Sequence, residues 1–257
     1  MSAASAPEFG CLYGVGVGPG DPELISIKGL RCLQQAPIVA FPEGIKGGPG
    51  IAEQIIESWI SPSQHRLPLS FPYVQEQSTL ERAWHRAAEQ VGQFLKEGRD
   101  VTFACEGDVS FYSTFTYLSQ AVRALYPQAR VETIPGICSP MAAAAAAGLP
   151  LTVQRDRLAV LPALYRLEDL TAVMAWAEVI VMMKVGSVYQ KVWSLLDQAQ
   201  LLAHSYVVVQ ASTTQQQIYQ NLQNYPQLEL PYFSLLIIHV KVTKEKALPN
   251  SRGLSRT

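Results

Sequence analysis

The first half of the chain alternates short apolar runs with longer amphipathic stretches. The apolar runs are rich in Val, Ile and Ala and are typical of buried strands, whereas the segments between them have the period of helices. This order predicts βαβ units with a mostly parallel sheet. The expected strands are Cys11–Val17, Pro37–Phe41, His65–Leu69, Val101–Cys105 and Arg130–Ile134. The expected helices are Glu23–Gln34, Gly50–Trp59, Thr79–Glu97 and Ser110–Tyr126.

The alternation resumes after Pro135-Gly136. The run Pro140–Gly148 contains six consecutive alanines and predicts a helix that would allow close approach of a backbone or ligand, although helix propensity alone also explains it. Further strands are expected at Leu158–Leu161, Val179–Met183, Tyr206–Gln210 and Tyr232–His239. Further helices are expected at Glu168–Trp176, Ser187–Asp197 and Thr214–Leu222.

These two series predict two α/β domains, residues 1–134 and 135–257. Each is expected to hold a mostly parallel or mixed five-stranded sheet flanked by helices, with the active site in the cleft between the domains. The polar stretch from about residue 241 predicts a loose tail.

Composition narrows the class of protein. The 257 residues include 20 basic and 21 acidic side chains, so no net field attracts nucleic acid. No apolar run reaches the ~18 residues of a membrane span, and the start lacks a signal peptide's pattern. We therefore expect a cytoplasmic protein without a nucleic-acid or membrane partner. Its four cysteines are widely spaced and predict reduced structural thiols rather than a metal site.

A glycine-rich turn follows the first expected strand, in the segment Gly14-Val15-Gly16-Val17-Gly18-Pro19-Gly20-Asp21-Pro22-Glu23. Such a turn exposes N–H groups to a ligand. A dinucleotide site requires G-x-G-x-x-G, but the sixth position counted from Gly14, Gly16 or Gly18 is Pro19, Asp21 or Glu23. A P-loop fails as well, because no Gly-Lys-Ser/Thr closes the motif. The simpler alternative is a tight connection in which Asp21 caps a helix.

A second polar turn follows the fourth expected strand, in Cys105-Glu106-Gly107-Asp108-Val109-Ser110-Phe111-Tyr112-Ser113-Thr114-Phe115-Thr116-Tyr117-Leu118. Ligands collect at the carboxyl ends of parallel strands, so this turn and the glycine turn are expected to face one crevice. Asp108 and Ser110 could simply cap a helix. However, two acids and a cluster of aromatic and hydroxyl side chains exceed what capping requires.

These motifs resemble those of the tetrapyrrole methylase family, the class III S-adenosylmethionine methyltransferases, over nearly the whole chain. Members of that family carry a GxGPGDPE-L turn, a GDP turn, a Pro-Gly-x-Ser/Thr segment at the domain junction, and later Met and Ala positions at the cofactor. The matching residues here are Gly18-Pro19-Gly20-Asp21, Gly107-Asp108, Pro135-Gly136-Ile137-Cys138-Ser139, Met183 and Ala211. The resemblance implies S-adenosylmethionine as methyl donor, a tetrapyrrole as acceptor, and a homodimer.

Further segments resemble the subgroup that methylates carbon 20 of precorrin-2 or cobalt-precorrin-2. They are Phe41-Pro42, Leu69-Ser70-Phe71-Pro72, Ala83-Trp84 and the EGD-x-x-x-YSTF-x-YL run. Val109 departs from the family pattern, because it occupies the usual position of Pro. The turn therefore lacks the rigid φ angle of proline.

The resemblance assigns a set of residues to the methyl donor: Pro19, Glu106, Gly107, Asp108, Ser113, Thr114, Cys138, Ser139, Met183, Ala211 and Ser212. The turn at Gly18–Asp21 is expected to face the acceptor. Methyl transfer from a sulfonium to carbon needs alignment more than a protein nucleophile, and a proton must later leave the methylated carbon. Asp21 is the first candidate for orienting or deprotonating the substrate, followed by Glu106 and Tyr112.

Basic side chains are expected to bind the carboxylates of the substrate. The candidates are Lys28, Lys46, Arg66, Arg82, Arg155 and Arg157. Lys184 is expected to face away from Met183, as a structural or solvent-reaching residue.

Three alternatives remain open on the sequence. One is a tetrapyrrole methyltransferase for another ring position or for uroporphyrinogen. Another is a nicotinamide-dependent oxidoreductase that uses the glycine turn. The third is a catalytically silent binding domain that kept the fold.

Overall fold

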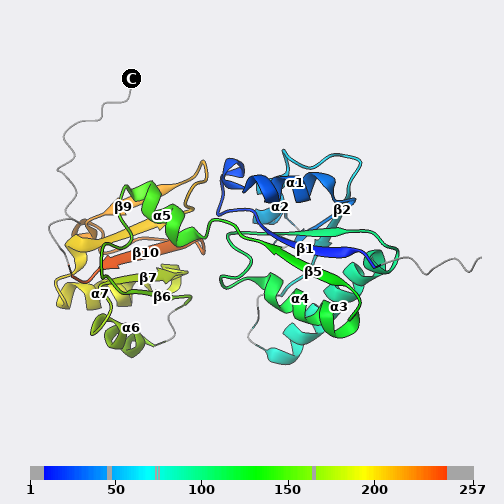
Figure 1. Ribbon diagram of the computed structural model, residues 1–257. Coiled ribbons are helices and arrows are strands. Elements are labelled where there is room, and N and C mark those ends of the chain that lie inside the picture. Colours follow the sequence, from blue (N-terminus) through cyan, green and yellow to red (C-terminus); the bar gives the residue numbers. More distant parts are fainter. Residues whose placement is uncertain (1–8, 45–47, 73, 75, 164–165, 242–257) are drawn as a thin grey trace, which may run out of the picture. The chain divides into compact units, whose positions relative to one another are not determined.

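Two five-stranded sheets organise the chain. The computed structural model describes residues 9–44, 48–72, 74, 76–163 and 166–241. The chain divides into two units, Met1–Cys138 and Ser139–Thr257, and each unit holds one sheet with helices on both faces (Figure 1). The expected pair of α/β domains with five-stranded sheets is confirmed. Lys46 and nearly all of the expected polar tail lie outside the described residues.

The sheet of the first unit is entirely parallel. Its strands are β1 (Cys11–Gly16), β2 (Ile38–Pro42), β3 (His65–Leu69), β4 (Val101–Cys105) and β5 (Arg130–Ile134). They lie in the order β3-β2-β4-β1-β5. Every residue of the central strand β4 is buried, because both faces of the sheet are covered by helices. The carboxyl ends of all five strands therefore lie at one edge.

Two pairs of helices cover the faces of this sheet. The helices α1 (Ile27–Gln35) and α2 (Ile51–Ile56) lie on one face, and α3 (Gln77–Lys96) and α4 (Thr114–Leu125) on the other (Figure 1). Side chains alternate along each strand, so Val15 packs into the core under α1 and α2, whereas Leu12 packs into the core under α3 and α4. The helices connect the carboxyl end of one strand to the amino end of the next. The turns that precede these helices therefore lie at the carboxyl edge of the sheet.

Two helices of the first unit begin later than the sequence indicates. Instead of one helix over Glu23–Gln34, a 3₁₀ helix η1 (Pro22–Leu24) precedes α1, because Ser26 leaves helical geometry to cap the N–H of Gly29. Helix α4 begins at Thr114 rather than at Ser110. Its cap is Ser113, whose hydroxyl accepts from the N–H of Phe115 at 3.0 Å.

The sheet of the second unit is mixed. Its strands are β6 (Leu158–Leu161), β7 (Val179–Met183), β8 (Ser205–Val209), β9 (Gln217–Gln220) and β10 (Ser234–His239), in the order β6-β7-β10-β8-β9. Strand β10 runs antiparallel to both of its neighbours, so β7 and β8 run in the same direction. Their carboxyl ends therefore flank the start of β10.

Helices also cover both faces of the second sheet. The alanine-rich helix α5 (Ser139–Ala147) lies on one face, and α6 (Leu167–Met174) and α7 (Tyr189–Gln198) lie on the other (Figure 1). Short 3₁₀ helices complete the unit: η3 (Val185–Val188), η4 (Leu202–His204) and η5 (Leu222–Asn224). The alanines let α5 approach closely, since Ala143 and Ala147 are buried against Val208 and Ile237 of the sheet.

The helix expected at Thr214–Leu222 is wrong. This segment contains the edge strand β9, which pairs antiparallel with β8. Ile218 and Tyr219 are half-buried and lie on opposite faces of the sheet, where they pack into its two cores. Pairing with the open edge of β8 has overridden the helix propensity of the glutamines, which is a weak local preference.

The cysteines form no disulfide, and the histidine of β10 is packed in the interior. All four cysteines are free, as expected. His239 is buried and meets Tyr206 edge to face, with 6.0 Å between ring centroids. Among the described residues, no group of His, Cys, Asp or Glu is arranged to hold a metal ion, and no helix has the length and apolarity to cross a membrane.

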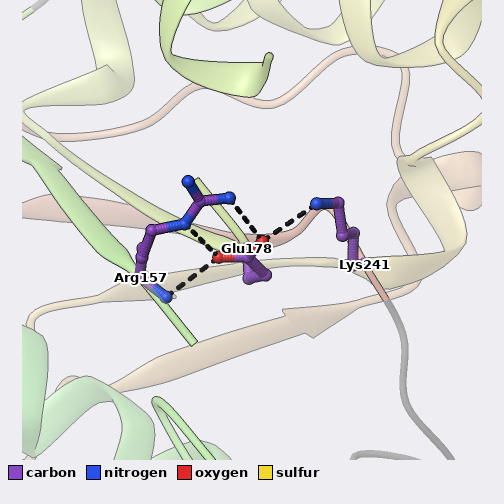
Figure 2. Close-up of polar contacts among 3 residues, drawn as sticks. All are labelled: Arg157, Glu178 and Lys241. Carbon is purple, nitrogen blue, oxygen red and sulfur yellow. Dashed lines mark hydrogen bonds and ion pairs between the residues drawn. The ribbon is translucent and has the colours of Figure 1, made fainter. Parts of the chain in front are cut away.

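An ion-pair cluster joins the ends of three strands in the second unit (Figure 2). Glu178 precedes β7, and its carboxylate accepts from the Nε of Arg157 at 2.9 Å, from the Nη2 of Arg157 at 2.8 Å and from the Nζ of Lys241 at 2.9 Å. The Arg157 side chain, followed by Lys241, holds the pKa of Glu178 well below its ordinary value. Arg157 adjoins β6 and Lys241 follows β10, so one carboxylate ties these ends together.

We predict that Glu178→Gln lowers the Tm at neutral pH. The lowered pKa means that the folded state binds fewer protons than the unfolded state. This stabilisation is present above the ordinary Glu pKa of ~4.3 and is lost as the pH falls toward the lowered value. The Tm difference between wild type and Glu178→Gln should therefore shrink on acidification below about pH 4. Thermal unfolding followed by circular dichroism across pH measures it.

Glu168→Gln is the matched control for this prediction. Its carboxylate lies 3.7 Å from Arg166, and both side chains are about three-quarters exposed. Such a pair contributes little to stability, so the Tm should hardly change. Equal effects of the two substitutions would contradict the assigned role of Glu178.

Candidate functional site

Two polar turns meet at the carboxyl edge of the first sheet. Gly18, after β1, and Gly107, after β4, form an isolated antiparallel bridge. Gly18 donates its N–H to the carbonyl of Gly107 at 3.2 Å, and Gly107 donates to the carbonyl of Gly18 at 2.8 Å. Both glycines have positive φ angles, 82° and 71°, which side chains rarely adopt. The two turns are therefore joined through their backbones, as the strand order predicts.

A third turn, after β5, packs against the other two without intervening side chains. A Cβ atom added to Gly16 would lie 2.6 Å from the nitrogen of Gly136 and 2.7 Å from the carbonyl oxygen of Gly107. A Cβ added to Gly136 would lie 2.3 Å from the same oxygen. Because such distances are far below van der Waals contact, only glycine fits at positions 16 and 136. We call Gly16, Gly107 and Gly136 the glycine cluster.

Asp108 ties this cluster together. Its Oδ2 accepts from the N–H of Gly136 at 2.8 Å, and its Oδ1 accepts from the N–H of Ser110 at 2.8 Å and from the Ser110 hydroxyl. Partial burial by itself would raise the pKa of Asp108. The hydrogen bonds from Ser110 and Gly136 outweigh burial and lower it, so the carboxylate is charged at neutral pH. Asp108 therefore links two turns and does not cap α4.

The remainder of the β4 turn is anchored in the core. Val109 is 4% exposed and belongs to the core under α3 and α4, so apolar packing holds the turn at the position where the family pattern has proline. Ser113 is buried, and its hydroxyl lies 2.8 Å from the Sγ of Cys105. Burial raises the pKa of Cys105 to about 12, despite the opposing hydrogen bond with Ser113. The thiol is thus neutral and unsuited to act as a nucleophile.

The candidate catalytic side chains of this turn are exposed. Glu106 is exposed directly after β4. Tyr112 is 57% exposed, and its ring meets that of Phe111 edge to face at 4.8 Å. Tyr112 has a φ angle of 52°, a conformation that costs a non-glycine residue roughly 1 kcal/mol or more. Thr114, the first residue of α4, is half-buried.

Asp21 lies in the turn that follows the Gly18–Gly107 bridge. It caps η1, and its Oδ1 accepts from the N–H of Glu23 at 2.8 Å. The indole of Trp59 donates to the carbonyl of Pro22 at 3.2 Å and fixes this short helix. The capping role that the sequence indicated is therefore real. The half-buried carboxylate of Asp21 retains accessible surface for a second role.

Pro19 and Cys138 complete the predicted residues around the glycine cluster, and Ser139 is the first residue of the second unit. Pro19 follows Gly18 and is half-buried. Cys138, also half-buried, lies close to the open side of Gly107, since a Cβ added there would lie 3.9 Å from the Cα of Cys138. Ser139 begins α5. The structure thus brings together the predicted residues of the first unit, from Pro19 to Cys138.

The remaining predicted residues gather in the second unit at the carboxyl ends of β7 and β8. Met183 ends β7 and pairs with Leu235 of β10, whereas Val209 ends β8 and pairs with Ser234. Ala211, two residues after β8, is buried. Ser212 is half-buried, and its N–H donates to the Oε1 of Gln216 at 2.7 Å. Met183 and Ala211 therefore lie on either side of the start of β10.

Sequence reasoning missed the backbone strain at this edge. Lys184, Gln210 and Ser212 have φ angles of 56°, 45° and 65°, in the left-handed region that favours glycine. These three residues follow β7 and β8, the strands on either side of β10, and strained conformations of this kind occur often at binding sites. Nothing in the sequence marks them, since none is a glycine or an asparagine.

Several candidate carboxylate-binding cations already have partners. Arg66 pairs with Glu53 at 2.8 Å, Arg157 pairs with Glu178, and Arg82 donates to the hydroxyl of Thr79 at 2.8 Å. These contacts reduce the availability of Arg66 and Arg157 for a substrate.

Comparison with known proteins identifies relatives over most of the chain. The sequence model of the family described as Tetrapyrrole (Corrin/Porphyrin) Methylases matches residues 11–224. The cobalamin biosynthesis protein CobIJ of Mycobacterium tuberculosis is 32% identical over 89% of this chain, which spans only 46% of that protein. The precorrin-2 C(20)-methyltransferase of a Sinorhizobium species is 33% identical, with 89% of this chain and 95% of the relative covered.

A solved structure has the same fold. The uroporphyrin-III C-methyl transferase of Thermus thermophilus, complexed with S-adenyl homocysteine, superposes with a TM-score of 0.59. The sequences are 21% identical, and the match covers 89% of this chain and 97% of the other. Because the match covers most of the chain, both units share the fold of the solved structure.

We predict that Gly136→Ala destabilises the protein by more than ~2 kcal/mol, because the added methyl group would overlap the backbones of Gly16 and Gly107. Gly148→Ala is the control. Gly148 also has a positive φ angle, 67°, but a Cβ there meets no atom within 4 Å, so the cost should stay near ~1 kcal/mol. Urea unfolding of both variants measures the difference, and equal losses would contradict close packing in the glycine cluster.

Proposed function

Because the chain belongs to the tetrapyrrole methylase family, we propose that it transfers a methyl group from S-adenosylmethionine to carbon 20 of precorrin-2 or cobalt-precorrin-2 in cobalamin biosynthesis. The observation that carries the proposal is the match, along nearly its whole length, to a precorrin-2 C(20)-methyltransferase. The segments that resemble this subgroup, above all the run from Glu106 to Leu118, support it. In the same proposal the protein is a cytoplasmic homodimer.

The first unit offers backbone groups suited to a folded nucleoside. The turn at Gly107 has no side chain of its own, and a Cβ added there would meet only the Cα of Cys138 within 4 Å, so a ligand can approach the backbone of this turn closely. S-adenosylmethionine carries an adenosine and an amino acid, both of which hydrogen-bond to peptide groups, and it supplies an electrophilic methyl group on a sulfonium. Asp108 holds the Gly107 turn against Gly136, so these groups are positioned in advance.

The second unit supplies the apolar part of the donor site in this proposal. Met183 is half-buried, and its polarizable thioether forms a wall for the adenine. Ala211 is small and buried, which leaves room beside its backbone. The left-handed conformation of Ser212 orients the following peptide groups.

The acceptor side is proposed to lie at the turn of Asp21. The electron-rich carbon of the tetrapyrrole forms the new carbon–carbon bond, and the pair of the broken carbon–sulfur bond remains on sulfur. The proton then leaves the methylated carbon for a base. Asp21 is our first candidate, because its carboxylate is held by η1 and is partly accessible. Glu106 and Tyr112, exposed on the neighbouring turn, are the others.

The product of the reaction tests the proposal directly. Purified protein is incubated with precorrin-2 or cobalt-precorrin-2 and with methyl-labelled S-adenosylmethionine, and the product is examined by mass spectrometry and carbon NMR. We expect one added methyl group at carbon 20. Methylation at another carbon, or methylation of uroporphyrinogen instead, would place the chain elsewhere in the family. Absence of any methylated product from these acceptors would refute a methyltransferase role.

We predict that Asp21→Asn lowers kcat by roughly 10²–10⁴-fold if this carboxylate is the base. Asparagine caps helices about as well as aspartate, so the Tm should be nearly unchanged. Glu23→Gln is the matched control, because it removes an exposed carboxylate from the same short helix and should leave kcat unaltered. Single-turnover methyl transfer measures both. A near wild-type rate for Asp21→Asn would exclude Asp21 as the base and leave Glu106 and Tyr112.

A further inference from the structure

Lys184 adopts a conformation that its residue type disfavours. It directly follows β7, has a φ angle of 56°, and exposes its side chain. Glycine would adopt this conformation without strain. A lysine kept here at a cost in stability suggests that its ammonium group has a use.

The ammonium is held over an aromatic ring. The Nζ of Lys184 lies 5.0 Å from the ring centroid of Tyr232, which is itself 45% exposed. In the part of the chain that the structure describes, Lys184 makes no ion pair with an acidic side chain, in contrast to Arg66, Arg157 and Lys241. A cation on an aromatic face keeps its hydrogen-bond donors available, because the ring accepts none of them strongly. The ammonium of Lys184 thus lies beside Tyr232, with its hydrogen-bond donors open to solvent.

The segments next to this pair in the sequence line a surface cavity of about 640 Å³ in the second unit. The wall at Gly186–Lys191 begins two residues after Lys184, and the wall at Leu228–Pro231 ends immediately before Tyr232. The walls touch at Gly186, where an added Cβ would lie 2.5 Å from the carbonyl oxygen of Leu230. This contact holds the segments of Lys184 and Tyr232 together.

Lys184 adds a positive charge beside a cavity whose own charged side chains balance. The cavity lining carries one basic side chain, Lys191, and one acidic side chain, Glu229. These two balance formally, so the neighbouring Lys184 makes the region attractive to an anion. An ammonium with free donors binds carboxylates, and the tetrapyrrole of the proposed function carries many of them on its periphery.

We propose that Lys184, positioned by Tyr232, binds a peripheral carboxylate of the tetrapyrrole at the edge of this cavity. The inference rests on the proposed function and names a residue that selects the acceptor. The amino-acid end of S-adenosylmethionine carries the other available carboxylate. A solvent-exposed lysine suits the many-branched acceptor better than a donor that must be enclosed around its sulfonium.

The test compares Lys184→Gly with Lys184→Arg in the full-length protein. Lys184→Gly removes the ammonium and relieves the backbone, so we expect the KM for the tetrapyrrole to rise about tenfold, with kcat and the Tm close to wild type. The Kd for S-adenosylhomocysteine, measured by calorimetry, should not change. Lys184→Arg keeps the charge and should restore the KM to within about threefold.

Gln200→Gly is the matched control, because Gln200 is also exposed and also has a φ angle of 56°. It should leave the KM unchanged. Tyr232→Ala should raise the KM as Lys184→Gly does, whereas Tyr232→Phe preserves the aromatic face and should not.

Two results overturn the inference. One is an unchanged tetrapyrrole KM in Lys184→Gly while the wild type is active, which shows that the ammonium does not bind the acceptor. The other is a weakened Kd for S-adenosylhomocysteine with an unchanged tetrapyrrole KM, which assigns Lys184 to the donor. Failure of the proposed function is distinct from both, because the wild type itself would then form no methylated product.

Discussion

The close packing of three peptide backbones at one edge of the first sheet is the constraint on which the rest of the site depends. The chain after β1, β4 and β5 passes through the glycine cluster, where a single methyl group at Gly16 or Gly136 would overlap a neighbouring backbone. Such packing requires a parallel sheet, because only then do the three strands end at the same edge. The positions of Asp21, Glu106 and Cys138 follow from it, since each lies within five residues of a clustered glycine.

This constraint explains why the site relies on position more than on reactive side chains. Asp108 uses both carboxylate oxygens to hold the turns, and the thiol of Cys105 is kept neutral by burial. Val109 anchors the same turn in the apolar core. What remains exposed is a rim of polar groups with few strong nucleophiles, which suits a reaction whose nucleophile comes from the substrate.

The sequence predicts the strands of the first sheet better than the edge strand β9 of the second. The bounds of β3, β4 and β5 agree with the structure. A buried apolar run marks β4, whereas turn residues on either side mark the mostly exposed edge strands β3 and β5. Local sequence does not determine where α4 begins. Ser110 and Ser113 are both good caps, and only the capture of Ser110 by Asp108 leaves Ser113 to begin α4. The strand β9 was missed because its stability comes from pairing with β8, a contact distant from any local pattern.

In the candidate site, too, local motifs identify some residues, whereas contacts between distant segments determine others. Motifs identified Gly18, Gly107 and Asp108, because glycines and turn acids carry a recognisable spacing. Lys184 illustrates what motifs cannot identify. Lys184 is exposed, as the expected solvent-reaching role requires, but it follows β7 in a left-handed conformation, so strand alternation does not set the direction of its side chain. Its contact with Tyr232 joins segments that are distant in sequence and that adjoin the paired strands β7 and β10. The contact of its ammonium with the ring of Tyr232 distinguishes Lys184 from Gln200, which has the same φ angle.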